Sequence, residues 1–422
     1  MSRLSKMNES IMTAFTNQPT TPTTPAPAQA RKKSNPPTLD WALLLIVGVL
    51  IAFGLMMVYS TTFDWSYRDF NSPTEILFRQ VRSLAVGLVV MFILARLDYH
   101  IWKRLAVPLL GLTLVALLAV LLFGSRAFNA QRGLLNGSYQ PSEVAKLVTI
   151  IYLGVWLTSK QEHINNITYG LLPYAIVVGV LAGLVLMQPD ISATLTVILV
   201  GATMFFLSGA DLMHITLGAV GSGILGYAIV MTSTTARTRI SDFLVGLTNP
   251  TETSWHVQQA IIAFINGGLF GRGLGESRQK FIALPTPHTD SVFAVIGEEL
   301  GLIGCLVVIF LFALLIWRGA RIAANAKDEL GSILAGGITT WIAFEVIINV
   351  GVMVAALPFA GNALPFISYG GSSLVAVLAA MGILLSISRH DPDASITRKT
   401  RAAFDYSRRD GRPRISSPRR SE

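Results

Sequence analysis

The chain has 422 residues, of which 52% are hydrophobic and 14% are charged, and its mean hydropathy is +0.56. Soluble domains contain about 25% charged residues, so this composition excludes an ordinary soluble globular protein. Apolar runs close to the ~20 residues that cross a bilayer recur along most of the chain, which predicts an all-α, polytopic membrane protein. A porin-like barrel would instead show ~10-residue segments of alternating hydrophobicity, and none are visible.

The single cysteine, Cys305, excludes an internal disulfide and a cysteine-cluster metal site. The six histidines are scattered without the spacing of a metal-binding motif. The net charge is +9, but no basic face interleaved with aromatic residues is visible, so nucleic-acid binding is not predicted.

Both ends of the chain differ in composition from its middle. Residues 1–40 are polar and rich in Pro and Thr, with no apolar signal-peptide core before Trp41. Residues 389–422 are polar and rich in Arg. We expect two disordered cytoplasmic tails, which act as topology anchors that contact anionic lipid or, alternatively, bind a partner.

Between the tails, residues 41–388 form one predicted transmembrane domain. The ten predicted spans are 41–60, 80–97, 104–123, 142–158, 169–187, 190–208, 212–231, 291–317, 332–355 and 370–388. With the N-terminus in the cytoplasm, 22 of the 33 Lys and Arg residues fall on the cytoplasmic side. An even number of spans returns the C-terminus to that side and leaves one long outer loop, 232–290.

Several basic residues fall on the outer side, against the usual orientation rule. Arg126 and Arg132 follow the third span, Arg237 and Arg239 begin the long outer loop, and Lys280 lies near its end. A single surface arginine needs no functional explanation. Several at the outer lipid boundary, however, indicate an anionic ligand that arrives from the membrane, such as a lipid pyrophosphate.

Carboxylates also occur within the predicted spans. In "QPSEVAKL", Glu143 and Lys146 are three residues apart, so they share a helix face and can pair. Such a pair faces the bundle interior or an aqueous cavity by default, and it either anchors the helix or serves a site. Glu298 and Glu299 are more typical of structural carboxylates, because Glu298 lies about 12 Å further along a helix than Asp290.

Three outer segments contain Pro or Gly residues that set the conformation of the backbone. "MQPDIS" (187–192) breaks an apolar stretch, and "LPFAGNALPFISYGGSS" (357–373) resembles a re-entrant loop. The glycines within 255–280 predict a movable segment that lies along the membrane interface. Because these segments and the outer cations share one side, we expect a single outward-facing site.

Four motifs occur in order and carry a family resemblance. "QPSEVAKL", "MQPDIS", "NGGLFGRGLGESRQKFIALPTPHTDSVFAVIGEELG" and "LPFISYGGSS" resemble the SEDS proteins (shape, elongation, division and sporulation) over about residues 41–388. "LMMVYS" at 55–60 and the long N-terminal tail resemble the FtsW branch more than the RodA branch.

The resemblance implies an activity and a set of site residues. The activity is polymerisation of lipid II on the outer face of a bacterial cytoplasmic membrane, with Asp290 of the "HTD" phrase as the essential aspartate. The resemblance also implies that Glu143 and Lys146 line the substrate cavity. With them, the candidate substrate and pyrophosphate contacts are Arg132, Arg126, Arg237, Arg239, Lys280 and His288. The implied structural and cavity residues are Gln140, Asp190, Glu298, Glu299, Asn349, Ser368, Gly370 and Gly371.

Partners and departures also follow from the resemblance. It implies a class B penicillin-binding protein bound through transmembrane helices, and other proteins of the divisome or elongasome. A divalent cation, Mg or Mn, could assist, although no dedicated ligand cluster is visible. This chain departs from the family pattern at 132–134, where Arg-Trp-Ile is usual, at Ser291 in place of phenylalanine, and at Glu345 in place of glutamine.

Asp290 is the candidate general base, which takes the proton of the attacking sugar hydroxyl. Alternatively, it is only the N-cap of the helix that follows, a role worth about 1 kcal/mol. Two other functions remain open at this point. A transporter or flippase for the same lipid would also use intramembrane charges, and a scaffold would recruit a partner without catalysis.

Overall fold

The computed structural model describes residues 40–389, apart from 124, 128–129, 134–139 and 250–251. The predicted tails, 1–40 and 389–422, therefore fall almost entirely outside the described residues. The long helices are α2 (Trp41–Phe70), α3 (Glu75–Arg96), α4 (Trp102–Phe123), α5 (Pro141–Ser159), α6 (Leu172–Leu186), α7 (Ile191–Leu207), α8 (Leu212–Thr232), α9 (Thr234–Thr248), α10 (Trp255–Gly267), α12 (Val292–Ala324), α13 (Glu329–Met353) and α14 (Gly371–Ser388). Shorter elements are η1 (Tyr99–Ile101), η2 (Gln161–His163), η3 (Ile167–Leu171), α11 (Gln279–Ile282) and a hairpin of β1 (Ser125–Ala127) with β2 (Ala130–Gly133).

Each of the ten predicted spans coincides with a helix, and the fold is all-α apart from the small hairpin. Within the described residues, eight helices are long and apolar enough to cross a membrane, and α7 is a shorter apolar helix. The main difference is α2, which continues ten residues beyond the predicted span, to Phe70. Its added turns are held because Ser66 donates to the carbonyl of Ser72 (2.6 Å) and accepts from the amide of Ile76 (3.3 Å).

Local sequence signals explain where the helices begin. Asp40, Asp190 and Asp328 accept a backbone N–H in the first turns of α2, α7 and α13, which is the usual role of an aspartate N-cap. Helix α5 begins with Pro141, whose missing N–H has no partner to lose in a first turn.

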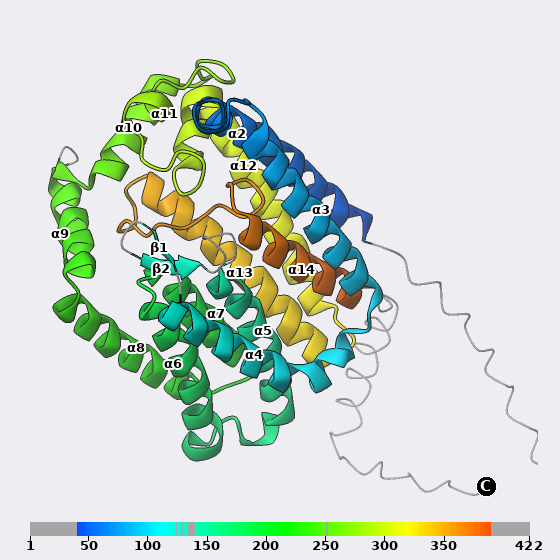
Figure 1. The fold of residues 1–422 in the computed structure, drawn as a ribbon. Helices are drawn as coiled ribbons and strands as arrows, with labels where there is room; N and C mark the ends of the chain where they lie inside the picture. The colour runs from blue at the N-terminus through cyan, green and yellow to red at the C-terminus, as the bar shows by residue number, and fades with distance from the viewer. Residues whose placement is uncertain (1–39, 124, 128–129, 134–139, 250–251, 390–422) are drawn as a thin grey trace, which may run out of the picture. The chain divides into compact units, whose positions relative to one another are not determined.

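Three helices form the centre of the bundle. About 67% of the most apolar window of α5 is buried, and about 72% of those of α13 and α14, whereas the other spans have 22–39%. Figure 1 shows α5, α13 and α14 surrounded by α2, α3, α4, α6 and α8. The outer helices expose large apolar side chains, such as Val107 and Leu122 of α4.

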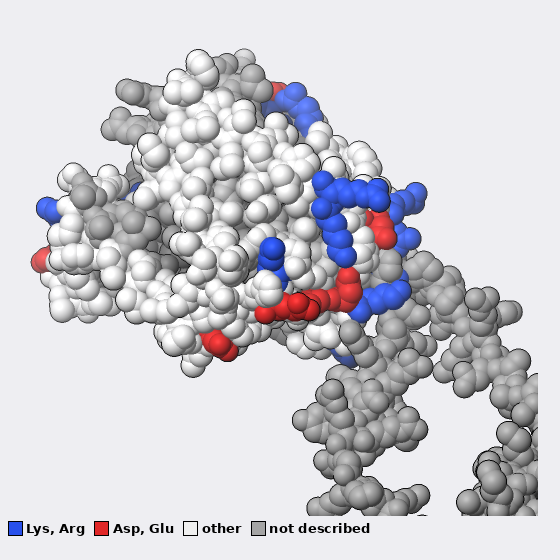
Figure 2. Space-filling view, turned by 90° about the horizontal axis from the view of Figure 1, so that it is seen from below, with Lys and Arg blue, Asp and Glu red and all other residues white. Residues whose placement is uncertain are grey.

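Figure 2 shows a described surface that is largely white, with most of the visible Lys, Arg, Asp and Glu gathered on the right and a few at the other edges. A soluble domain would distribute its charges over all faces, so this surface is a lipid-facing one. The chain is a multi-pass membrane protein.

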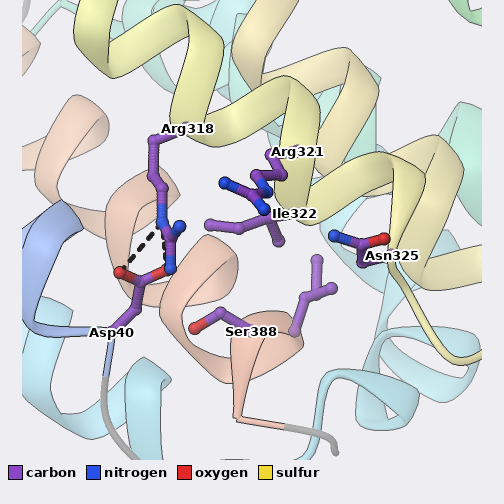
Figure 3. A pocket seen from close by; sticks show the side chains of 7 residues that line it. Asp40, Arg318, Arg321, Ile322, Asn325 and Ser388 are labelled. Carbon is purple, nitrogen blue, oxygen red and sulfur yellow. Dashed lines mark hydrogen bonds and ion pairs between the residues drawn. The ribbon is translucent and has the colours of Figure 1, made fainter. Parts of the chain in front are cut away.

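The two ends of the bundle lie on the same face. Asp40, before α2, and Ser388, at the end of α14, line one pocket of about 280 Å³ (Figure 3). There the Asp40 carboxylate accepts from Nε of Arg318 on α12, at 2.9 and 3.1 Å. An even number of crossings joins two such ends, as ten do. The opposite face, formed by residues 61–75, 187–192, 268–291 and 354–370, is called the loop face below.

The long segment 232–290 is largely helical and firmly attached. Helix α12 is interrupted at Gly301 (φ 69°, ψ −168°), a conformation that essentially only glycine adopts. Into this interruption fits the turn after α10, through hydrogen bonds from Leu302 N to Gly268 O (2.9 Å) and from Arg272 N to Glu298 O (3.0 Å). The glycines near 268 therefore allow close backbone packing, whereas the sequence analysis interpreted them as a movable segment.

Candidate functional site

Asp290 lies on the loop face, one residue before the N-cap of α12. The N-cap is Ser291, so Asp290 does not occupy the capping position that the alternative role requires. The side chain of Asp290 is half-buried, and its Oδ2 faces Gly361, where an added Cβ would lie only 2.8 Å away. The carboxylate therefore occupies a space that the absence of a side chain at Gly361 leaves open.

The turn that carries Asp290 is fixed by its own hydrogen bonds. Thr286 has φ 44°, an unusual value for a β-branched residue, and its carbonyl accepts from Thr289 N (3.2 Å) and Ser291 N (3.3 Å). The Ser291 hydroxyl donates to the carbonyl of Pro285 (2.9 Å). Conformations like that of Thr286 cost about 1–3 kcal/mol, and the closed turn holds it in place.

The loop before α14 holds this turn from outside. Ser368 Oγ donates to the carbonyl of Thr289 (2.6 Å), and Tyr369 N donates to that of His288 (2.8 Å). Gly370 N donates to Gln80 Oε1 on α3 (3.3 Å). At Gly371 an added Cβ would lie 2.7 Å from Ser83 Oγ, so this glycine allows α14 to approach α3.

Lys146 is buried between two carboxylates. Its Nζ donates to Glu143 Oε1 (2.9 Å), which is the ion pair that the spacing predicts, and also to Glu345 Oε1. Trp341 Nε1 donates to the same Glu345 oxygen (2.7 Å). Glu345, unusual for the family resemblance, therefore makes this cluster a triad of two carboxylates and one ammonium group.

A chain of amide groups connects the triad to Asp290. Asn362 Nδ2 donates to the backbone carbonyl of Glu345 (3.0 Å). Asn349 Nδ2 lies within bonding distance of two carbonyls, those of Asn362 (2.5 Å) and Asp290 (2.9 Å). Asn349 was among the predicted site residues, but Asn362, the only amide side chain in the loop 357–373, was not.

Asp190 organises the neighbouring corner of the loop face. Its carboxylate accepts from Gln140 Nε2 (3.1 Å), Ser142 Oγ (3.1 Å) and the backbone N–H of Ala193 (3.2 Å). Ser192 Oγ is 3.1 Å from Asp190 Oδ1 and 2.8 Å from the carbonyl of Gly361. Gly361 thus lies between the Asp190 cluster and the Asp290 carboxylate, so these two groups are neighbours on the loop face.

Glu298 and Glu299 hold the long loop. Glu298 accepts from Ser277 Oγ (2.5 Å) and Gln279 N (3.1 Å), and Glu299 accepts from Ser60 Oγ (2.7 Å) and Lys280 Nζ (2.6 Å). Lys280 is only 9% exposed. Lys280 was predicted to contact pyrophosphate, but its ammonium group is buried and already paired with the Glu299 carboxylate.

The structure describes the side chains of two of the four predicted outer arginines. Arg126 and Arg132 lie in the β1–β2 hairpin, but their side chains fall outside the described residues. Arg237 is exposed and donates to the carbonyl of Met231 (2.5 Å). Arg239 is half-buried, with its guanidinium carbon 5.3 Å from the centre of the Phe359 ring.

An apolar cavity of about 680 Å³ adjoins the site. It is lined by α7, α8, α9, α13 and residues Leu357, Pro358, Phe359 and Ala360, and Arg239 is its charged lining residue. Figure 1 shows α8 and α9 at the edge of the bundle, so this cavity lies beside the lipid-facing surface. Its wall continues directly into Gly361, the residue that faces Asp290.

His288 is part of an aromatic cluster rather than a cationic one. Its ring centre is 4.6 Å from that of Trp65 on α2 and 6.0 Å from that of Tyr369. Burial lowers the pKa of His288 to about 4, so the imidazole is neutral at pH 7. His288 can therefore meet a substrate at pH 7 as a neutral hydrogen-bonding group, and its role as a substrate contact stays a prediction.

The sequence analysis did not identify Trp65, Tyr369, Arg79 or Arg82 as site residues. Arg79 and Arg82 lie in the first turns of α3, at 3.2 and 3.6 Å from Glu75, and both act electrostatically on Tyr369. The available signal was the mixture of aromatic and charged residues in "FDWSYRDF", which follows an apolar run. Among the described residues, no group of three or more His, Cys, Asp or Glu side chains is arranged to hold a metal ion.

Comparison with known proteins gives a consistent result. The family model described as "Cell cycle protein", for FtsW, RodA and SpoVE, matches residues 40–393. A probable peptidoglycan glycosyltransferase FtsW from Trichlorobacter lovleyi is 41% identical over 85% of this chain and 96% of its own length. Stage V sporulation protein E from Bacillus subtilis is 37% identical over 85% and 98%, respectively.

Two solved structures share the fold. One, described as structural coordination of polymerization and crosslinking by a peptidoglycan synthase complex, has a TM-score of 0.69 and 27% identity, and covers 83% of this chain and 98% of that chain. The rod shape determining protein RodA from Thermus thermophilus has a TM-score of 0.62 and 27% identity, with 83% and 97% covered. From its motifs, its helices and these similarities, the chain belongs to the FtsW/RodA/SpoVE family of cell cycle proteins.

Proposed function

We propose that this protein is a peptidoglycan glycosyltransferase that polymerises lipid II into glycan strands. One observation carries the proposal: the half-buried Asp290 carboxylate faces Gly361, which continues the wall of an apolar cavity beside the lipid. A lipid-linked sugar needs this combination, because its chain must stay in an apolar environment while its sugar meets a base. The names of the relatives, peptidoglycan glycosyltransferase among them, support the same activity.

The reaction joins the 4-hydroxyl of an acceptor GlcNAc to the anomeric carbon of a donor MurNAc. As the new C–O bond forms, the hydroxyl proton passes to the Asp290 carboxylate. The bond from the anomeric carbon to the phosphate oxygen breaks, and undecaprenyl pyrophosphate leaves with the electron pair. An α-linked donor that gives a β-linked product requires inversion, so one displacement and one base suffice.

Cations would stabilise the charge that develops on the leaving pyrophosphate. Arg239 at the cavity rim is the best-placed of the predicted set, and Arg237 lies on the same helix. Arg126 and Arg132 complete the proposed group. The Glu143–Lys146–Glu345 triad is too deeply buried to bind pyrophosphate directly, and we assign to it the support of α5 and α13 beneath the site.

In this proposal the loop face is extracytoplasmic, and both ends of the bundle, with the tails at 1–40 and 389–422, are cytoplasmic. The excess of Lys and Arg on the cytoplasmic side supports this orientation. The partner is a class B penicillin-binding protein, whose membrane helix would pack on exposed apolar helices, as the similarity to a peptidoglycan synthase complex supports. The similarity to relatives named FtsW supports a role in septal wall synthesis within the divisome, with a RodA-type, side-wall function as the alternative.

Purified protein in detergent, supplied with lipid II, tests the activity. We expect polymer from the wild type and a loss of at least about 100-fold in rate for Asp290→Asn, which keeps the side-chain shape but removes the base. Asp211→Asn, an exposed aspartate on the opposite face, is the matched control and should retain activity. A flippase makes no polymer in detergent, where no compartments exist, and a chelator in the same assay tests the divalent cation.

A further inference from the structure

Three aromatic rings from separate segments meet on the loop face: Trp65 of α2, His288 before α12 and Tyr369 before α14. The ring centres of Trp65 and Tyr369 are 6.3 Å apart at nearly a right angle, and those of Trp65 and His288 are 4.6 Å apart and tilted by 31°. We propose that this cluster is a stacking platform for a pyranose ring of the glycan substrate. The inference rests on the proposed function, because the ligand is the sugar on which Asp290 acts.

The position of the cluster relative to Asp290 supports a sugar ligand. Only Thr289 separates His288 from Asp290, so their Cα atoms are at most about 7 Å apart. A saccharide bound at the base must therefore extend over or beside the platform. Trp65 is 37% exposed, which leaves ring surface available to a ligand.

The chemistry of the cluster favours a sugar over a phosphate. A pyranose presents apolar C–H faces and polar hydroxyl edges, and aromatic rings with polar tips match both surfaces. A phosphate binds best to charged donors, whereas His288 is neutral at pH 7 because burial lowers its pKa to about 4. Arg79 and Arg82 lie close enough to influence Tyr369, and they can serve the negatively charged parts of the same substrate.

Two hydrogen bonds hold the platform in place. Trp65 Nε1 donates to Asp69 Oδ2 (2.5 Å), so the indole is fixed by a residue one turn further along α2. Tyr369 N donates to the carbonyl of His288 (2.8 Å), which joins the two loops directly behind the rings. The extension of α2 past its predicted span, to Phe70, brings Trp65 to this place.

Substitutions of Trp65 test the platform, with kcat and KM for lipid II measured separately. We expect Trp65→Ala to raise KM by about 10-fold, the size of one aromatic stacking contact, and Trp65→Phe to stay within about 3-fold of wild type. Trp317→Ala removes a more exposed tryptophan, at 56% against 37% for Trp65, from α12 near the opposite face, and should leave KM unchanged. A purely structural role predicts a lower melting temperature and lower kcat, without the recovery by phenylalanine.

Binding measurements in the inactive Asp290→Asn background separate this inference from the proposed function. Trp65→Ala should weaken binding of lipid II by about 10-fold but leave binding of undecaprenyl pyrophosphate, which carries no sugar, within about 2-fold. Equal weakening of both ligands, or of neither, would overturn the platform. If Trp65→Ala weakens lipid II alone but the wild type makes no polymer, the platform stands and the proposed activity fails.

Discussion

The ionisable side chains inside the bundle are not equivalent, and the triad around Lys146 shows why. Two carboxylates, Glu143 and Glu345, share one ammonium group, so removing either carboxylate still leaves a matched pair. Removing the lysine instead leaves two negative charges in a buried place without a counter-ion. A buried charge that loses its partner costs about 3–5 kcal/mol.

We therefore expect Glu345→Gln to keep both the fold and polymerisation within about 3-fold of wild type, because Gln can still accept from Trp341. Lys146→Met should lower the melting temperature in detergent strongly, by the cost of the orphaned carboxylates. Thermal unfolding of both single variants and of the variant that carries both substitutions measures how strongly Glu345 and Lys146 are coupled. If Glu345→Gln proved as damaging as Lys146→Met, Glu345 would have a role beyond pairing.

His288 predicts a dependence of stability on pH. Its folded pKa, about 4, lies below the ordinary histidine value near 6.5, so the unfolded chain binds a proton before the folded one does. Stability should fall as pH decreases from about 6.5 to 4, and melting curves of His288→Gln should show a smaller fall. His256, whose pKa is also lowered by burial and by Arg239, keeps part of the effect in that variant. An unchanged slope would show that His288 is solvated in the folded state.

Contacts between residues could be predicted from the sequence where both residues lie close together on one helix. The Glu143–Lys146 pair follows from two positions on one helix face. Trp65, Asn362 and Gly361 were missed, because each acquires its role from another segment: Trp65 from the turn at His288, Asn362 from α13 and Gly361 from Asp290. Lys280 and His288 were placed on the correct face, but the burial that gives them other partners depends on α2 and α12 together.

At the scale of elements, the interruption of α12 is the feature most sensitive to substitution. Gly301 adopts a conformation reserved for glycine, and an added Cβ would lie 2.4 Å from Gly271 N and 2.5 Å from Leu269 O. Both nearby atoms belong to the backbone, so a side chain there cannot be accommodated by rotating a neighbour. The turn after α10 would have to separate from α12, and with it the anchors of Glu298 and Glu299.

Gly301→Ala should accordingly lower the melting temperature and raise proteolysis of the segment 268–280. Gly179→Ala on α6 is the control, because an added Cβ there meets nothing within 4 Å and alanine favours a helix. Limited proteolysis and thermal unfolding in detergent measure both effects. A Gly301→Ala protein as stable as Gly179→Ala would show that α12 can straighten without losing the turn.

The existence of the ten helices could be predicted because membrane spans are long and uniformly apolar. Their ends could be predicted less well: α2 continues through the polar "TTFDWSYRDF" because hydrogen bonds from the α2–α3 turn support it. The hairpin β1–β2 has too few residues for a periodic pattern. The glycines of the long loop indicated a flexible backbone. In the structure, hydrogen bonds to the interrupted part of α12 hold that backbone in place.

For the whole molecule, the two ends of the bundle, at Asp40 and Ser388, line one pocket beside Arg318 of α12, and the site lies on the opposite face. Orientation can be tested with few changes, since Cys305 is the chain's only cysteine and is buried. We expect a membrane-impermeant maleimide to label Glu276→Cys on the loop face of intact spheroplasts. Glu162→Cys, on the other face, should react only after permeabilisation. The reverse pattern would place the site in the cytoplasm and contradict the proposed function.

Gly361 has a consequence for how this protein can fail. An added methyl group there would meet only the end of the Asp290 side chain, which can rotate away at little cost to folding. A variant with this one extra carbon would keep its fold and every acid and base, yet aim the Asp290 carboxylate elsewhere. Damage at Gly361 would therefore show as lost activity in a protein whose melting temperature is unchanged.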